Sequence, residues 1–537
     1  MATTTKATIT NTVPATQTRE LDRQLSYLDG TSLVVGTIIG SGIFASPGSV
    51  IHHAGSGGAS LIIWVFSGLI AYLGSLCYAE LALSIPSAGG EVTYLKRAYN
   101  DIISFTYMWA NVFITRPASF GIITLIFGEY LCRFVTPFAR PEQGLDECSH
   151  SVWTQVFAFI CALVVSFLNI WSLRRAAVVL SFSTGIKVVA LVGLTSIGLA
   201  YFFAALIGSP LNGRTEDQIM LSISFINTSS TIYDYPAAFM SALWAYDGWN
   251  GLSYAIEELN ESKDLVPILS LSIPLVTLLY AAANSAYIIS LPYEIVSSSE
   301  TVAVDLLLSI FGEFGEILMT LFVCISTFGA AIGSLYASSR LVFSAARDGQ
   351  LPSRLSVLHS TTKTPLWAIL SQFILTCFYL IIGDFEQLVI IFGTSTLFFY
   401  FITVFGMLRL RYSEPNLRRP YITSSINAWI FCTVTLFLVI VELFANPLST
   451  LVSIAFISIG IPIQLYRQYL QKKKITGFRS LTEYEEVEQN DPEDNDVQKV
   501  SEESHLAEAT IDEERKIRER IMRRRSYSDE EGTIAIV

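Results

Sequence analysis

Long apolar segments with very few charges recur along the chain from about residue 30 to residue 468. Each has about 20 residues or more, which as a helix is enough to cross a hydrocarbon core of about 30 Å. The pattern predicts an all-α membrane protein with twelve transmembrane helices. They are expected at about 30–50, 58–83, 104–134, 152–172, 177–207, 236–257, 265–292, 313–345, 365–384, 386–410, 423–445 and 448–467.

The apolar segments divide the chain into three parts. Residues 1–24 are polar and rich in threonine, and we expect them to form a disordered cytoplasmic tail. Residues 25–470 would form the transmembrane domain. Residues 471–537 are poor in apolar residues and dense in charge, which predicts a second disordered, acidic cytoplasmic tail. No cleavable signal peptide opens the sequence, so the first apolar helix would serve as the insertion signal.

Positive charges between the segments predict the orientation in the membrane. An even number of spans puts both termini on one side, and lysine and arginine favour the cytoplasmic connections. The connections on the side of the termini carry Lys96, Arg97, Arg174, Arg175, Lys263, Arg347, Arg354, Lys363, Arg411, Arg418 and Arg419. The opposite side carries mainly Arg133, Arg140 and Arg214. Both termini are therefore expected in the cytoplasm, with the protein in the plasma membrane and in contact with its lipids.

Composition excludes a soluble globular protein and gives no sign of an enzyme. Hydrophobic residues make up 52% of the chain and charged residues only 15%. The net charge of -12 comes largely from residues 481–514 and says little about a partner for the membrane domain. No cluster has metal-ligand spacing, so we expect no metal, no cofactor and no nucleic-acid partner. The histidines are all peripheral, at His52, His53, His150, His359 and His505.

Two sequence features concern the outward-facing loops. Cys132 and Cys148 flank such a loop and could pair with each other, whereas the other five cysteines lie in predicted spans. The sequence Asn227-Thr228-Ser229 is a glycosylation acceptor on the outward side. Asn227 is thus the candidate for glycosylation.

Small residues interrupt the first apolar segment at its centre. The stretch Gly36–Phe44 reads GTIIGSGIF. Glycine inside a helix costs about 1 kcal/mol relative to alanine, and backbone that unwinds at membrane depth is tolerated only where it lines a cavity or is buried in protein. An unwound Gly40-Ser41-Gly42 can direct free N–H groups, at the positive end of a half-helix, toward a carboxylate. The alternative is that these glycines form a close-packing helix face.

The sixth apolar segment has a matching interruption. The stretch Trp244–Gly251 reads WAYDGWNG, which puts Asp247, Gly248 and Asn250 at its centre. The two interrupted segments are five spans apart, and five is odd, so corresponding helices of two halves would run in opposite directions. We therefore predict a 5+5 inverted repeat with discontinuous helices 1 and 6. Substrate would bind between the two breaks, near the middle of the bilayer.

Two charged residues lie inside apolar segments. Lys187 is about ten residues from either end of the fifth segment. An ionisable residue at that depth indicates a functional site, whereas a lysine near a helix end would extend to the interface. Arg116, before Pro117 in the third segment, is expected to face protein or water rather than lipid.

Several motifs in order resemble the L-type amino acid transporters of the amino acid–polyamine–organocation superfamily. They include the two interrupted segments, Cys77–Leu81, Arg116-Pro117 and Ser338–Leu341. The resemblance covers residues 25 to about 470 and implies transport of zwitterionic amino acids by alternating access. It implies that Gly40, Ser41 and Gly42 bind the α-carboxylate of the substrate.

The resemblance also implies roles for residues around the breaks. The α-amino group would meet the backbone carbonyl of Ile38 and carbonyls of helix 6 near Trp244 and Asp247. Trp244 matches an aromatic residue that gates the site from outside, and Leu397 would border the side-chain pocket. Two further residues, Lys187 and Ser326, would couple substrate binding to the movement of the helices. Lys187 resembles a stand-in for a sodium ion between helices 1 and 8, near Ser326.

The chain departs from the family pattern at two places. Asp247 stands where many animal members have glycine, and its carboxylate could hold the substrate amine, bind a proton or cap the broken helix. Many animal members join a glycoprotein through a cysteine early in the loop after the third helix, but residues 136–141 contain no cysteine. This argues against a disulfide-linked heavy chain and favours a fungal or microbial member that works alone.

The sequence therefore predicts secondary active transport of neutral L-amino acids, by exchange or by proton symport. One alternative is a carrier for cationic amino acids or polyamines, with Asp247 as the acid that binds the amine. The other is a nutrient-sensing receptor that binds an amino acid and signals through its long C-terminal tail.

Overall fold

The computed structural model describes residues 25–86, 90–139, 152–171, 173–206, 216–254, 256, 259–360, 362, 364–382 and 385–488. These residues are almost entirely helical, with one isolated bridge between Leu25 and Leu259, so the all-α expectation is confirmed. The chain divides into one unit of residues 1–465 and a second of residues 466–537. The predicted tail 1–24 lies outside the described residues. Of the predicted tail 471–537, only residues 471–488 are described, as the end of a helix.

The first unit is built from helices of very different lengths. Its first part contains α1 (Tyr27–Ile38), α2 (Gly42–Ala54), α3 (Gly57–Ser84), α4 (Gly90–Ala98), α5 (Asp101–Ala110), the π-helical turn η1 (Asn111–Thr115), α6 (Arg116–Ala139), α7 (Val152–Trp171) and α8 (Leu173–Leu206). The rest contains α9 (Glu216–Ser222), α10 (Tyr235–Ala245), α11 (Gly251–Tyr254), α12 (Leu265–Ser290), α13 (Tyr293–Ser298), α14 (Val302–Phe311), α15 (Glu313–Arg347), α16 (Leu366–Ile382), α17 (Phe385–Ser413), α18 (Ser425–Ala445) and the start of α19 (Pro447–Glu488).

The helices of the described residues do not confirm the predicted number of spans. Eight helices of the described residues are long and apolar enough to cross a membrane, and nine if α1 and α2 count as one broken span. Twelve helices are therefore not confirmed. The difference lies in the expected segments 177–207, 236–257 and 365–384. The described apolar part of α8 is Gly185–Tyr201, the second segment is split into the short α10 and α11, and α16 has only 17 residues.

Both predicted interruptions are breaks in the structure. The axes of α1 and α2 meet at an angle of 48°, with residues 39–41 between them. A capping box starts α1, because Ser26 accepts from the Asp29 N–H while the Asp29 carboxylate accepts from the Ser26 N–H. Between α10 and α11, Gly248 has φ +101°, a conformation that glycine adopts without strain.

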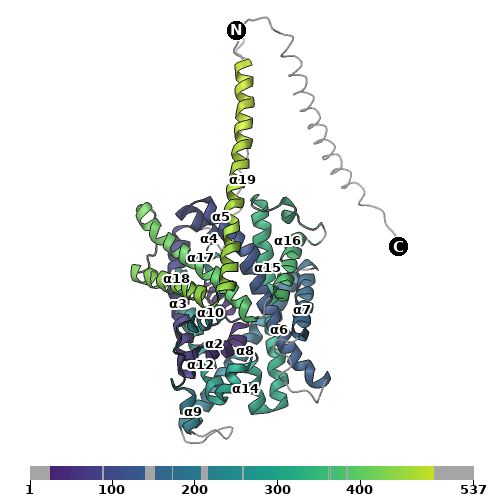
Figure 1. Ribbon diagram of the computed structural model, residues 1–537, viewed down its shortest axis with the longest axis vertical. Helices are drawn as coiled ribbons and strands as arrows, with labels where there is room; N and C mark the ends of the chain where they lie inside the picture. The colour runs from purple at the N-terminus through teal and green to yellow at the C-terminus, as the bar shows by residue number, and fades with distance from the viewer. Residues whose placement is uncertain are drawn as a thin grey trace, which may run out of the picture. The chain divides into compact units, whose positions relative to one another are not determined.

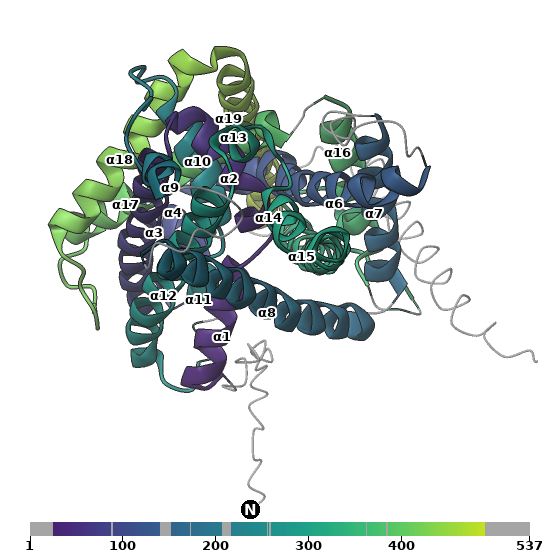
Figure 2. The ribbon, with the colours of Figure 1, turned by 90° about the horizontal axis from the view of Figure 1, so that it is seen from below.

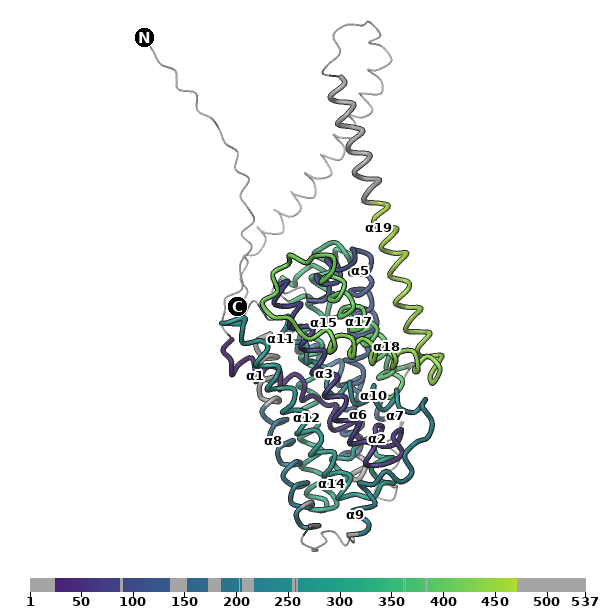
Figure 3. The backbone as a smooth tube through the Cα atoms, turned by 90° about the vertical axis from the view of Figure 1, so that its left-hand side faces the viewer, coloured from purple at the N-terminus to yellow at the C-terminus, as the bar shows by residue number. Residues whose placement is uncertain are grey.

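The helices of the first unit run between two ends. Figure 1 shows α9 and α14 at one end and α4 and α5 at the other, and Figure 3 shows the same separation of α9 and α14 from α5. We call these ends the α14 side and the α4 side. Figure 2 shows α6, α7 and α16 gathered beside α15, and α8 running beside α12. The broken helices lie inside this arrangement, where α2 packs against α10.

The outward faces of the helices are apolar, as lipid contact requires. On α3, the exposed side chains are Ile62, Val65, Phe66 and Leu69. Their spacing of three and four residues places them on one stripe of the helix. The opposite face of α3 carries Trp64 and Tyr78 into the core. A helix that presents apolar side chains on both faces is typical of a membrane span.

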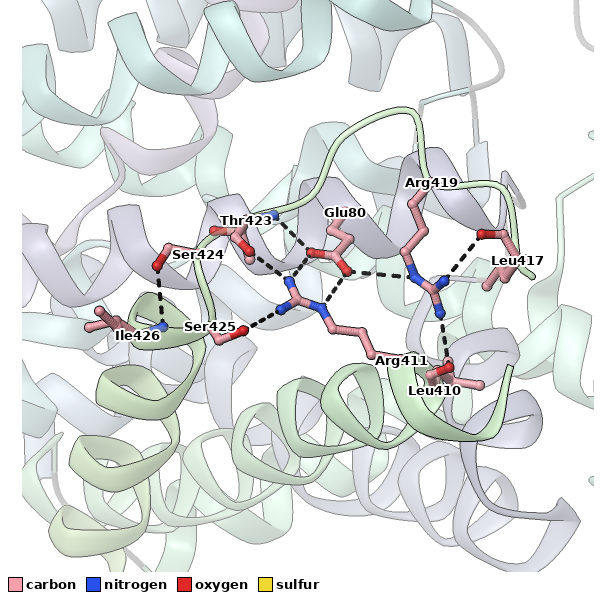
Figure 4. Close-up of polar contacts among 9 residues, drawn as sticks. All are labelled: Glu80, Leu410, Arg411, Leu417, Arg419, Thr423, Ser424, Ser425 and Ile426. Carbon is pink, nitrogen blue, oxygen red and sulfur yellow. Dashed lines mark hydrogen bonds and ion pairs between the residues drawn. The ribbon is translucent and has the colours of Figure 1, made fainter. Parts of the chain in front are cut away.

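Glu80 on α3 holds the connection between α17 and α18 (Figure 4). Its carboxylate accepts from Arg411 Nε at 2.9 Å, from Arg411 Nη2 at 2.5 Å and from the Thr423 N–H at 2.9 Å. Arg419 Nε lies 3.9 Å from the same carboxylate, and Arg419 also donates to the carbonyl of Leu417. Glu80 is only 1% exposed. A single buried carboxylate thus neutralises two arginines on the α4 side.

Glu80→Gln is expected to lower the free energy of unfolding by about 2 kcal/mol, because two largely buried arginines lose their shared counter-charge. Thermal unfolding of the purified protein in detergent measures this. Glu313→Gln is the matched control, since Glu313 is exposed and makes no ion pair within the described residues. Equal unfolding temperatures for the two variants would contradict the role of Glu80.

A second ion pair on this side holds α4. Arg97 on α4 donates to Glu414, which follows the last residue of α17, with 2.7 Å between Nη2 and Oε2. This hydrogen bond holds the pKa of Glu414 below its ordinary value. Both side chains are more than a third exposed, so water screens the pair and its contribution to stability is small. The ion pair instead fixes the position of α4 against the C-terminal end of α17.

Candidate functional site

The two breaks lie in direct contact. A Cβ atom built on Gly42, the first residue of α2, would lie 2.5 Å from the Cα atom of Ala245, the last residue of α10. Only glycine permits this approach of two backbones. On the other side of the breaks, Thr37 Oγ1 lies 3.4 Å from the carbonyl oxygen of Gly248. The unwound parts of both helices therefore form one continuous surface.

Tyr280 on α12 joins the two breaks. Its hydroxyl oxygen lies 2.9 Å from the carbonyl oxygen of Ile38 and 3.1 Å from that of Ala245. The side chain is fully buried, and its one hydroxyl proton can serve either carbonyl. Ile38, named from the sequence as an acceptor for the substrate amine, therefore already receives a hydrogen bond from the protein. The Gly40 N–H donates to the same oxygen at 2.7 Å, so both of its lone pairs have donors and a substrate ammonium has to replace one of them.

The N-terminus of α2 keeps free donors. Gly40 N–H donates to the Ile38 carbonyl at 2.7 Å. The N–H groups of Ser41 and Gly42 make no hydrogen bond within the described residues, and the Ser41 side chain does not cap α2. Ser41 is nonetheless buried. Free N–H groups at the positive end of a helix are a ready site for an anion.

A cavity of about 260 Å³ lies beside the breaks. Its wall includes Asp247, Gly248 and Asn250 of the predicted site, together with Thr37 from the end of α1. Ile38, Gly40, Ser41 and Gly42 lie next to Thr37 in the chain but do not line the cavity. The other lining residues are Glu91, Tyr107, Asn111, Thr115, Arg116, Gly251, Ala337, Phe392, Thr396, Phe399 and Tyr400.

A smaller, mostly apolar cavity of about 20 Å³ adjoins the first. Trp244 and Leu397, both named from the sequence, line it together with Met240 and Phe431. Asp247 borders both cavities. The structure therefore separates the named residues into three neighbouring places: the free N–H groups of α2, the larger polar cavity and the smaller apolar one.

A chain of polar contacts crosses the larger cavity. The Tyr400 hydroxyl donates to Asp247 Oδ1 at 3.4 Å, and Asn250 Nδ2 lies 3.5 Å from that hydroxyl. Asn250 Nδ2 also donates to Glu91 Oε1 at 3.2 Å. Arg116 lines the same cavity and interacts electrostatically with Asp247, so it faces protein and cavity as predicted. Sequence reasoning did not place Glu91 or Tyr400 in the site.

The π-helical turn η1 explains how the third span reaches this cavity. Pro117 has no N–H group, so the helical hydrogen bond to the carbonyl of Phe113 cannot form. Tyr379 donates to that carbonyl instead, at 3.0 Å, and Gln372 donates to the neighbouring carbonyl of Val112 at 3.1 Å. The π turns of helices often occur at functional sites. The motif Arg116-Pro117 was the sequence signal for this irregularity.

The larger cavity continues toward the α4 side. A neighbouring cavity of about 330 Å³ shares Glu91, Tyr107, Asn111 and Arg116 with it. The rest of that second wall comes largely from the C-terminal part of α15, beginning at Arg340. Toward the α14 side, the rings of Trp244 and Phe385 meet edge to face with centroids 5.8 Å apart. The described residues thus line a path that leads from the breaks toward the α4 side.

The two residues named for coupling are buried on neighbouring helices. Lys187 on α8 is 3% exposed and makes no hydrogen bond or ion pair within the described part of the chain. Ser326 on α15 has a buried hydroxyl oxygen without a hydrogen-bond partner. The helices α8 and α15 pack against each other. An uncompensated ammonium in the interior is costly, which makes a structural role alone a poor explanation of Lys187.

The residues predicted to lie in outward-facing loops are partly described. Asn227 is exposed and has φ 64° in the connection between α9 and α10, so its glycosylation stays a prediction. Cys132 is disulfide-bonded, while Cys148 lies outside the described residues. Their pairing therefore stays a prediction. Among the described residues, no group of three or more histidine, cysteine and acidic side chains could hold a metal ion.

Comparison with known proteins identifies the family of the chain. The family described as "Amino acid permease" matches residues 25–462. The large neutral amino acids transporter small subunit 2 of Mus musculus is 34% identical over 460 residues, which is 84% of this chain and 82% of that protein. The Asc-type amino acid transporter 1 of Mus musculus is 32% identical over 444 residues, covering 82% and 81%.

A third relative extends the comparison. The b(0,+)-type amino acid transporter 1 of Homo sapiens is 33% identical over 436 residues, which is 80% of this chain and 85% of that protein. These matches bear out the resemblance drawn from the interrupted segments and the motifs between them. They span both breaks, the π-helical turn and the helix that carries Lys187. The chain therefore belongs to the amino acid permease family.

Proposed function

We propose that this protein is a secondary active transporter that carries neutral L-amino acids across the plasma membrane by alternating access. The observation that carries the proposal is the contact between the two breaks. Free N–H groups of Ser41 and Gly42 at the positive end of α2 lie beside the last turn of α10, which ends at Ala245. A zwitterion needs anion donors and carbonyl acceptors close together, and broken membrane helices supply both.

The substrate carboxylate binds the N–H groups at the start of α2. The substrate ammonium donates to the carbonyl oxygen of Ile38 and to carbonyls at the end of α10. Tyr280 supports this arrangement, because its hydroxyl lies within hydrogen-bond distance of the carbonyls of Ile38 and Ala245 and can donate to either one. The side chain extends past Trp244 toward Leu397, where the lining is mostly apolar. An apolar pocket beside the sites for the substrate carboxylate and ammonium selects amino acids with uncharged side chains.

The α4 side is assigned to the cytoplasm and the α14 side to the outside. The α4 side carries Lys96 and Arg97 on α4, Arg347 at the end of α15 and Arg411 on α17. An excess of lysine and arginine in the connections of one side favours the cytoplasm. The path toward the α4 side then makes this an inward-facing state, with Trp244 and Phe385 closing the outer route.

Lys187 acts as a fixed cation at the place where α8 packs against α15. Its burial and its lack of a partner support this role, since a buried charge needs compensation in at least one state of the cycle. A fixed ammonium at this place can take the part of a mobile cation. The free hydroxyl oxygen of Ser326 on the facing helix is available as one acceptor.

Competition for uptake tests the substrate class. Purified protein in liposomes should take up labelled leucine, and excess unlabelled leucine or alanine should suppress that uptake. Excess lysine or putrescine should leave it largely unchanged, because the apolar cavity offers no acid beyond Asp247. Liposomes without protein are the control. Stronger suppression by lysine than by alanine would contradict the neutral class.

A carrier for cationic amino acids is the second candidate, favoured by the position of Asp247. Its carboxylate borders both cavities and accepts from Tyr400. If Asp247 mainly holds the broken helix, Asp247→Asn should keep that hydrogen bond and leave leucine uptake within about threefold of the wild type. Uptake of labelled leucine and labelled lysine by the same vesicles measures the effect.

The glycine variant decides between the two candidates. Asp247→Gly removes the carboxylate and the acceptor for Tyr400 together. Under the neutral proposal it weakens leucine uptake and creates no new preference. Loss of lysine uptake combined with a gain of leucine uptake would show that Asp247 recognises a cationic group.

Two further proposals concern partners and the tail. We propose that the protein acts without a disulfide-linked heavy chain, since Cys132 is already disulfide-bonded and the described Cys77, Cys161, Cys324, Cys377 and Cys432 lie within helices as free thiols. Equal mobility on reducing and non-reducing gels of whole membranes tests this.

Uptake that survives removal of residues 475–537 would assign the tail to regulation. Saturable binding without transport would instead favour a receptor.

A further inference from the structure

Beside the aromatic contact that closes the route toward the α14 side lies a polar contact. Trp244 on α10 packs against Phe385, the first residue of α17. The next residue, Glu386, has its Oε1 atom 2.9 Å from Nε2 of His53. His53 lies in the last turn of α2. Two adjacent residues of α17 thus contact the two helices that form the substrate site, one contact for each.

These contacts lie at the far ends of the helices that carry the site. Along α2, His53 is eleven residues after Gly42, or about 16 Å at the rise of an α-helix. His53 and Gly42 lie on the same helix, so a movement of α2 away from α17 that separates His53 from Glu386 also displaces Gly42. The helix α17 also lines the cavity, through Phe392 and Tyr400. Access from the α14 side requires α2 and α10 to separate from α17.

A second carboxyl group, besides that of Glu386, lies near His53. Glu442 on α18 interacts electrostatically with both His53 and Glu386, and it accepts from Asn446 Nδ2 at 2.7 Å. His53 therefore faces two carboxyl groups. The neighbouring ring of His52 has its centroid 5.2 Å from that of His53, but His52 is exposed.

Other acidic groups on the elements around α2 are engaged elsewhere or make no ion pair. Glu300, between α13 and α14, interacts with Glu129 on α6, and Glu129 accepts from Thr154. Asp305 on α14 pairs with Arg133, and Asp234 before α10 accepts from Ser229. Glu294 on α13 makes no ion pair within the described part of the chain. Protonation of His53 therefore acts mainly on its contacts with α17 and α18.

We propose that His53 and Glu386 form a latch that holds the outer route closed and makes its opening depend on outside pH. This rests on the proposed function, in which the α14 side faces outward. Both are positioning residues, since neither reaches the substrate. The charge of histidine changes between about pH 5 and pH 8. Acid on the outside strengthens the latch, lowers the population of the outward-open form and weakens the apparent affinity for outside substrate.

The test uses the full chain in cells that lack their own leucine uptake. The KM for external leucine is measured at outside pH 7.5 and 5.5. In the wild type, the KM should rise about threefold at the lower pH, the size expected for a partly exposed ion pair. His53→Gln and Glu386→Gln should each give a lower KM that no longer depends on pH. His52→Gln is the matched control and should keep the wild-type profile.

An exchanged pair protects the test against misfolding of the single variants. The double variant, His53→Glu with Glu386→His, restores one histidine and one carboxylate and should recover the dependence on pH. A KM that depends on pH equally in wild type and both single variants would overturn the latch. So would a double variant with a flat profile at normal surface abundance. Absence of leucine uptake by the wild type would instead refute the proposed function.

Discussion

Lys187→Met is expected to slow amino acid uptake about a hundredfold, near the upper end of coupling energies between sites in proteins. The ammonium lies buried on α8 without a partner in this state, so its charge must be compensated in another part of the cycle. Methionine keeps the length and the apolar stem of lysine and removes only the charge. Initial rates of leucine uptake per reconstituted protein measure the effect, and a thermal unfolding curve shows that the variant is folded.

Val189→Met is the matched control on the same helix. Val189 is 64% exposed on the outward face of α8, so a longer side chain there meets lipid. It should transport leucine at the wild-type rate. An unchanged rate for Lys187→Met, with both variants equally stable, would show that Lys187 has no part in coupling.

Gly42→Val is expected to reduce uptake below detection. The added side chain would begin 2.5 Å from the Cα atom of Ala245, and neither atom belongs to a flexible side chain that could give way. The valine would force α2 away from α10 and separate the N–H groups of the first break from the carbonyls of the second. Leucine binding to the purified protein, measured by scintillation proximity, should be lost together with uptake.

Gly40→Ala provides the comparison within the same break. The nearest atom to a Cβ at Gly40 is the carbonyl oxygen of Ile38 at 3.8 Å, an ordinary contact. Alanine also keeps the N–H group. This variant should bind and transport leucine within a few-fold of the wild type. Equal loss in both variants would show that the break tolerates no side chain at all, and that the contact with Ala245 is not the cause.

The breaks themselves could be predicted because their sequence contradicts the surrounding apolar pattern. Three glycines and a serine in the first segment, and Asp247, Gly248 and Asn250 in the sixth, are poor residues for the middle of a membrane helix. The same argument gave Lys187 and Arg116, whose charges stand out in apolar surroundings. Residues that are unfavourable in the middle of an apolar helix can therefore be recognised from the sequence alone.

Tyr280, Tyr400 and Glu91 could not be predicted in this way. Tyr280 lies 242 residues from Ile38 in the chain, and a tyrosine in an apolar helix has the same sequence pattern as any core aromatic residue. Tyr400 stands in a run of aromatic residues that gave no sign of its contact with Asp247. Glu91 is the second residue of α4, and its contact with Asn250 depends on how α4 folds back after α3. Tertiary packing decides which of several similar side chains reaches the site, and the local sequence pattern does not contain that information.

The predicted number of spans is not confirmed by the described helices, for a related reason. Counting apolar residues treats a broken segment as one helix of full length. In the structure, α10 ends at Ala245 and α11 has four residues, so neither alone is long enough to cross a membrane. The residues that identify the site are the same residues that interrupt the helix.

The central claim is movement of a neutral amino acid across the membrane through the protein, either by exchange or by net uptake. The most direct test is uptake of labelled leucine by the purified protein in liposomes, either empty or preloaded with leucine, with and without an acid-outside gradient. Uptake only into preloaded vesicles would identify an exchanger, with Lys187 as a fixed cation. Gradient-driven uptake into empty vesicles would identify proton symport and make Lys187 and Asp247 the first proton carriers to test.

Either form of uptake is the result that the account predicts, and unlabelled alanine should suppress it. Saturable binding of leucine without uptake under any of the four conditions would contradict the account.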